Sequence, residues 1–181
     1  MHYDENEPTI IMATIESGDL LGWASDNRST YTDLVIKGIR RFTNEDYGHV
    51  GIAWRVHDGL CDELLVLEAT MPRIRVARVT TDQEFYCVPM NITWSEKSKN
   101  FLLGKLGLPY GVVDAIRGGT GHHVAHDMKW QCAEYAHAFY EMSGVLLPLE
   151  YTPGRLIANA EKYSGKKALR VIGPGRTLDF D

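Results

Sequence analysis

The sequence has few cysteines, and their spacing fits neither a disulfide framework nor a cysteine-rich metal site. Three of 181 residues are cysteine, Cys61, Cys87 and Cys132, and no CxxC pair occurs. An odd number of widely spaced cysteines is typical of free thiols in a reducing compartment. The sequence therefore predicts a fold that holds together without covalent cross-links.

Long hydrophobic runs and a surplus of positive charge are also absent. No segment approaches the roughly 18 apolar residues that a membrane-spanning helix needs. The first ten residues, MHYDENEPTI, are acidic and polar, unlike a signal peptide. We expect cytoplasmic residence, unless a phage or an effector system carries the protein elsewhere. With 19 basic and 24 acidic residues, the net charge of −5 does not predict a broad nucleic-acid-binding face.

The composition is that of one ordinary globular domain. Hydrophobic residues make up 44% of the chain and charged residues 24%, and neither a repeat nor a long linker divides it. Its length fits a single domain over residues 1–181. The composition leaves the oligomeric state open.

Short apolar runs dominate the first half of the chain and helical patterns the second. The runs predict strands at 9–15 and 19–24 and in the segments HVGIAWRV, LLVLEA, IRVARV and FYCVPM. Helical spacing and capping signals predict helices at 32–43, 95–107, 130–144 and 153–165. Strands in a meander followed by helices indicate an α+β fold rather than a doubly wound parallel sheet.

Residues 49–69 have the pattern of a β-hairpin. An Asp-Gly turn at Asp58 and Gly59 would place His49 directly opposite Glu68, with Cβ atoms roughly 4.5–5.5 Å apart. A register slip of two residues would keep both side chains on one face, which they would share with the small residues Gly51 and Ala53. The pair either orients a working imidazole or serves only the surface of the sheet.

Cys132 lies near the start of the helix predicted at 130–144. There the helix dipole lowers the pKa of a thiol, which favours a nucleophilic thiolate. Its helical spacing with Ala136 and Tyr140 directs the thiol toward the core, where the face of Gly51 and Ala53 would receive it. The alternative is an inert, buried cysteine, the commoner role of a free thiol. His137 lies too far around the same helix to be its partner.

Several segments together resemble circularly permuted papain-like cysteine hydrolases of the NlpC-type superfamily, most closely the YiiX-like branch. In chain order they are GDLLGW, IKGIRRF, YGHVGIA, VLEAT, GLPYG and WQCAEYAHAFY. The resemblance implies an antiparallel sheet or half-barrel packed against a helix that carries the nucleophile, with the histidine strand before that helix in the chain.

By position, the resemblance makes Cys132 the nucleophile, His49 the general base and Glu68 the residue that orients the histidine. It implies hydrolysis of amide bonds in peptides, peptidoglycan stem peptides among them, through a thioester and without a cofactor. Acyl transfer or thioester hydrolysis on a lipid or acyl substrate, and an inactive binding module, are the alternatives.

A Gly- and His-rich loop, expected at 108–127, offers a competing chemistry. GHHVAHD supplies His122, His123, His126 and Asp127 as possible metal ligands, but neither HExxH nor cysteine-rich spacing accompanies them. The glycines around 118–121 favour a loop beside the active site over a metal-binding helix. We therefore expect no metal.

Overall fold

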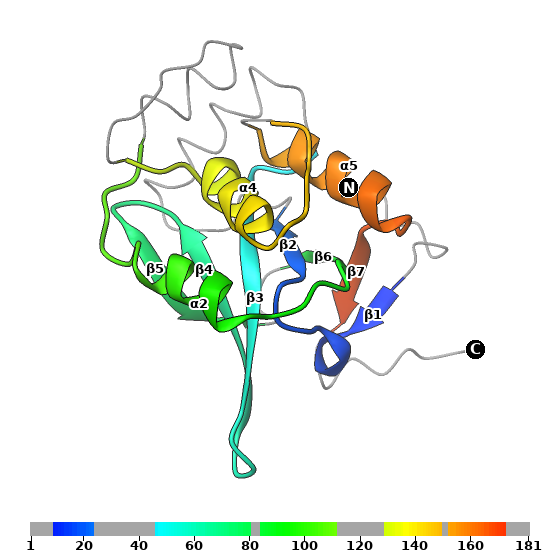
Figure 1. The fold of residues 1–181 in the computed structure, drawn as a ribbon. Helices are drawn as coiled ribbons and strands as arrows, with labels where there is room; N and C mark the ends of the chain where they lie inside the picture. Colours follow the sequence, from blue (N-terminus) through cyan, green and yellow to red (C-terminus); the bar gives the residue numbers. More distant parts are fainter. Residues whose placement is uncertain (1–8, 24–45, 81–83, 112–128, 150–151, 173–181) are drawn as a thin grey trace, which may run out of the picture.

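The computed structural model describes residues 9–23, 46–80, 84–111, 129–149 and 152–172 (Figure 1). The elements, in chain order, are β1 (Thr9–Ile11), η1 (Met12–Thr14), β2 (Leu20–Trp23), β3 (His49–His57), β4 (Asp62–Ala69), β5 (Ile74–Arg78), β6 (Tyr86–Val88), α2 (Glu96–Leu103), α4 (Cys132–Met142), α5 (Pro153–Ser164) and β7 (Leu169–Ile172). The predicted helix at 32–43 and the metal-ligand candidates at 122–127 lie outside these residues.

The strands form one sheet in the order β1-β7-β6-β2-β3-β4-β5. Strands β2 to β5 are the predicted antiparallel meander, whereas β6 returns to pair with β2 on its other side. Strand β7, which the sequence pattern did not predict, pairs with β6 and runs parallel to β1. The α+β class is confirmed, with helices α2, α4 and α5 on one side of the sheet (Figure 1).

The β3–β4 hairpin is present, but its predicted turn and register are wrong. His57 pairs with Asp62, and Ile52 pairs with Leu67 rather than Leu65, a shift of two residues. A longer loop, closed by the Asp58 carboxylate, replaces the two-residue turn. That carboxylate accepts hydrogen bonds from the backbone N–H groups of the third and fourth loop residues, at 2.9 and 2.7 Å. Because the shift is even, every side chain keeps its predicted face.

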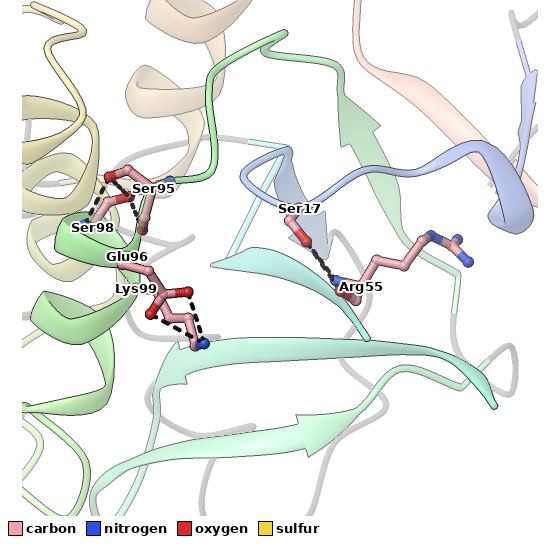
Figure 2. A network of polar contacts seen from close by, with 6 residues as sticks. All are labelled: Ser17, Arg55, Ser95, Glu96, Ser98 and Lys99. Carbon is pink, nitrogen blue, oxygen red and sulfur yellow. Dashed lines mark hydrogen bonds and ion pairs between the residues drawn. The ribbon is translucent and has the colours of Figure 1, made fainter. Parts of the chain in front are cut away.

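Two further boundaries differ from prediction. The apolar run at 9–15 is a strand only as far as Ile11, after which the chain turns through η1. The helix predicted to close at Gly107 ends at Leu103, and its capping box pairs Ser95 with Ser98 (Figure 2). Helix propensity decides such ends only weakly, because packing and caps outweigh it.

The other two described helices end as predicted. Gly144 follows α4 with φ 80°, and Gly165 closes α5 in the left-handed conformation with φ 68°. Pro153 occupies the first turn of α5. Among the described residues, no helix is long and apolar enough to cross a bilayer.

Two buried clusters sit on the sheet. The larger joins α2, α4 and α5 to the sheet through side chains such as Val50, Ile52 and Phe139. The smaller includes Leu21, Ala53, Val66 and Phe85, and none of its described members lies on α2, α4 or α5. Alternation along β3 sends odd and even positions to opposite faces. Ser17 fastens the segment before β2 to β3, because its hydroxyl accepts a hydrogen bond from the Arg55 N–H at 2.9 Å (Figure 2).

Candidate active site

His49 is the first residue of β3, and Glu68 lies near the end of β4. The Nε2 of His49 lies 2.6 Å from the Oε2 of Glu68, and both side chains are buried, at 5% and 0% exposed. The prediction that His49 lies directly opposite Glu68 is wrong, because the register is shifted by two residues. The shift still leaves both side chains on one face of the sheet and in contact with each other. The His49 ring also lies against Trp23, with ring centroids 5.5 Å apart.

Cys132 is the first residue of α4, preceded by Gln131 as N-cap. Its side chain hydrogen-bonds to the His49 imidazole and to the backbone N–H groups of Val50 and Ala133. The sulfur thus lies where the free N–H groups of a helix start meet the first residues of β3. The structure brings Cys132, His49 and Glu68 together in one chain of contacts.

The titration of the pair follows from this geometry. Burial raises the pKa of Cys132, but the hydrogen bond and charge of His49 and the two N–H groups outweigh it, so the thiol pKa is lowered. Burial lowers the pKa of His49, but hydrogen bonds with Cys132 and Glu68 outweigh it, so the imidazole pKa is raised. Both shifts favour a thiolate beside an imidazolium.

The prediction that the sheet face of Gly51 and Ala53 receives the Cys132 thiol is wrong. Helix α4 packs with Val50 and Ile52, whereas Ala53 belongs to the smaller cluster, which includes no described residue of α2, α4 or α5. A Cβ at Gly51 would lie 2.5 Å from Cγ2 of Val66, in that same cluster. The more apolar face of β3 takes the helix, and His49 meets Cys132 at the beginning of the strand instead.

Tyr110 is a site residue that sequence reasoning did not assign. Its side chain hydrogen-bonds to Cys132, and burial and the neighbouring Cys132 raise its pKa, so the phenol stays protonated. The backbone N–H of Tyr110 donates to the Pro72 carbonyl at 3.0 Å, and the next N–H donates to the Trp130 carbonyl at 3.1 Å. The tyrosine is part of the segment GLPYG, which contributes to the family resemblance, but the sequence pattern gave this residue no role.

Arg75 is a second residue that the sequence did not reveal. It lies directly opposite Glu68 in the β4–β5 ladder. Its Nε and Nη2 donate to Oε1 of Glu68 at 3.0 and 2.8 Å. The alternation of IRVAR shows that Arg75 points to one face of its strand. Placing it beside Glu68 also requires the register between β4 and β5, which the sequence pattern did not give.

The remaining candidates are not part of this cluster. The Nε2 of His137 lies 3.0 Å from the carbonyl oxygen of Leu147. Cys87 is buried in β6, where burial raises its thiol pKa. Cys61 does not lie in a strand but is exposed in the hairpin loop between β3 and β4. Within the described ranges no group of His, Cys, Asp and Glu is arranged to hold a metal ion.

The site is thus a buried thiol hydrogen-bonded to an imidazole, which a buried carboxylate holds from its other side. Such an arrangement can generate a thiolate nucleophile and return its proton to a leaving group. Comparison with known family models finds no match for this chain, and comparison with curated proteins finds none either.

Proposed function

We propose that this protein is a cysteine hydrolase with a permuted papain-like fold, which cleaves an amide bond through Cys132, His49 and Glu68. The observation that carries the proposal is the His49 imidazole, which contacts both the Glu68 carboxylate and the Cys132 thiol. The chain order supports the permuted arrangement, because the histidine strand β3 precedes the cysteine helix α4.

In acylation the two ring nitrogens of His49 have different roles. Glu68 engages Nε2, so Nδ1 is the nitrogen left to take the thiol proton. The thiolate of Cys132 attacks the carbonyl carbon, and a C–S bond forms. The C–N bond then breaks, and the His49 imidazolium gives its proton to the departing amine.

Deacylation repeats the proton movements with water. His49 takes a proton from the water as its oxygen attacks the thioester carbon. The C–S bond breaks, the acid product leaves, and the proton returns to the sulfur. A different acceptor in place of water would make the same site an acyltransferase.

Two hydrogen-bond donors near the sulfur would stabilise the negatively charged oxygen of the tetrahedral intermediate. One is the backbone N–H of Cys132 at the start of α4, where helix N–H groups lack intrahelical partners. The other is the Tyr110 hydroxyl, which stays protonated beside the sulfur. Donors fixed before the reaction stabilise the developing charge without reorganisation.

The substrate class rests on the resemblance found in the sequence. It favours peptide amides, peptidoglycan stem peptides among them, over lipid or acyl thioesters. Peptide and acyl substrates share the electrophilic carbonyl that the thiolate attacks, so the acylation step is common to both.

An activated ester tests that step directly. The protein is incubated with p-nitrophenyl acetate, quenched in acid and digested, and acetylated cysteines are mapped by mass spectrometry. We expect acetyl on Cys132, with nitrophenol release that persists in Cys61→Ser and is lost in Cys132→Ala. Equal release from Cys132→Ala, or acetyl only on Cys61, would contradict the proposal.

A further inference from the structure

The two oxygens of the Glu68 carboxylate contact different side chains, His49 and Arg75. Oε2 contacts the His49 ring at 2.6 Å, and Oε1 accepts both hydrogen bonds of the Arg75 guanidinium fork. Glu68 is 0% exposed, whereas the Arg75 side chain is 50% exposed. Arg75 therefore connects the buried carboxylate to the surface of the protein.

A buried carboxylate needs such a partner to remain ionised. Taking the ion out of water favours its neutral form, and removing one member of a buried pair leaves the other charge uncompensated. Arginine is always charged, and the Nε and Nη2 of Arg75 converge on a single carboxylate oxygen, Oε1, which they hold in place. With Oε1 fixed in this way, Oε2 is directed at Nε2 of His49.

Backbone hydrogen bonds connect the Arg75–Glu68 ion pair to the segment that carries Tyr110. Arg75 and Glu68 are directly opposed in the β4–β5 ladder. On the outer edge of β5, Ile74 exchanges backbone hydrogen bonds with Gly107 and Leu108, at 3.0 and 2.9 Å. That same segment leads into Tyr110, so the strand that positions Arg75 is tied to the segment that delivers the tyrosine to Cys132.

We propose that Arg75 is a positioning residue that keeps Glu68 ionised and directed at His49, and thereby maintains the Cys132 thiolate. This inference rests on the proposed function. Without Arg75, either Glu68 takes up a proton and stops stabilising the imidazolium, or it stays charged and makes the site more negative. Both outcomes disfavour the thiolate, so the acid limb of Cys132 reactivity moves to higher pH.

The chain supplies a matched control. Arg78 forms an ion pair with Glu63 across the same two strands. Arg78 is 68% exposed and Glu63 39%, and neither contacts His49 or Cys132 in the described structure. Removing Arg78 deletes a cross-strand ion pair from β5 while leaving the Glu68 carboxylate untouched.

The experiment measures iodoacetamide alkylation of Cys132 against pH in the wild-type chain, Arg75→Met, Arg75→Lys and Arg78→Met. Peptide mass spectrometry separates Cys132 from the other thiols, and circular dichroism checks folding. We expect the acid limb in Arg75→Met to move up by about one pH unit. Arg75→Lys should move less, because it keeps the charge without the fork. Arg78→Met should match the wild type.

A second readout does not depend on reactivity. The hydrogen-bonded Nε2–H of His49 is followed by NMR on ¹⁵N-histidine-labelled protein and assigned by its absence in His49→Gln. We expect a protected signal in the wild type and Arg78→Met, and faster exchange with solvent in Arg75→Met. Equal exchange and equal acid limbs in Arg75→Met and Arg78→Met would overturn the inference while leaving the hydrolase proposal standing.

An unreactive Cys132 in the wild type would instead remove the hydrolase proposal. The NMR comparison would then decide the remaining question, whether Arg75 holds Glu68 against His49. A uniform fall in alkylation that follows the folded fraction, with an unchanged acid limb, would show a merely structural role for Arg75 and also overturn the inference.

Discussion

The Tyr110 side chain hydrogen-bonds to Cys132, although the two residues lie on different segments of the chain and meet through tertiary packing. Main-chain bonds to the Pro72 carbonyl and from Trp130 to the Pro109 carbonyl, at 3.0 and 3.2 Å, hold the tyrosine segment in place. In the reaction that we propose for Cys132, a hydroxyl fixed beside the sulfur would stabilise the charged oxygen formed during acyl transfer, but it has no such role in simple alkylation.

Tyr110→Phe should therefore separate the two reactions. We expect acylation by p-nitrophenyl acetate to fall about 100-fold, the usual effect of losing one oxyanion donor. Alkylation by iodoacetamide, which forms no oxyanion, should change far less. An equal loss in both reactions would mean that the hydroxyl acts on the thiolate itself.

Glu68→Gln removes the charge that supports the imidazolium. The pKa of His49 should fall, and the pKa of Cys132 should rise with the loss of its charged partner. At a pH on the acid limb, Cys132 alkylation should slow about tenfold for each unit of that shift. Glu63→Gln, on the same strand, is the control and should leave the rate unchanged.

Gly51→Ala tests how closely β3 and β4 must approach beside the site. The new methyl would lie 2.5 Å from Cγ2 of Val66 and 3.4 Å from Cβ of Glu68. Overpacking of this kind costs about 1–3 kcal/mol, measurable by urea unfolding. A movement of β4 that relieves the contact with Val66 would also carry Glu68 away from His49, and Cys132 alkylation should then slow. The double variant Gly51→Ala/Val66→Ala makes room for the methyl and should recover part of the rate. No recovery would place the cause elsewhere.

Tyr140→Phe should affect stability without affecting chemistry. The buried Tyr140 hydroxyl donates to the Gly18 carbonyl at 3.1 Å and links α4 to the chain before β2. Its loss should lower the free energy of unfolding by about 1 kcal/mol. Tyr163→Phe, at an exposed position, should change it by less than about 0.5 kcal/mol. A large loss of Cys132 alkylation in folded Tyr140→Phe would contradict this separation.

Local patterns in the sequence predicted most of the strands and helices and the shared face of His49 and Glu68. Alternation in HVGIAWRV and the glycines after α4 and α5 predicted strands and helix ends, because face alternation and left-handed caps are local properties. His49 and Glu68 came within contact despite the wrong turn, since an even register shift preserves faces.

Long-range relationships were beyond the sequence pattern. The turn after His57 depended on the Asp58 carboxylate bonding the loop backbone, which a two-residue hairpin rule does not consider. The side of the sheet that α4 covers, and the contacts of Arg75 and Tyr110, depend on which segments pack together. Those choices follow from tertiary packing, whose energy is shared among many distant residues.

The most direct test of the central claim is the pH dependence of Cys132 alkylation. Cys132 is 2% exposed, so a small reagent such as iodoacetamide is required. A lowered thiol pKa means that the thiolate persists as the pH falls through the range, around 8.5, where a cysteine in a model peptide becomes protonated. The account predicts that the rate of Cys132 relative to such a peptide rises as the pH is lowered from 9 toward the folded-state pKa. It also predicts that His49→Gln abolishes the rise. A Cys132 rate that falls in parallel with the peptide, and is indifferent to His49→Gln, would contradict it.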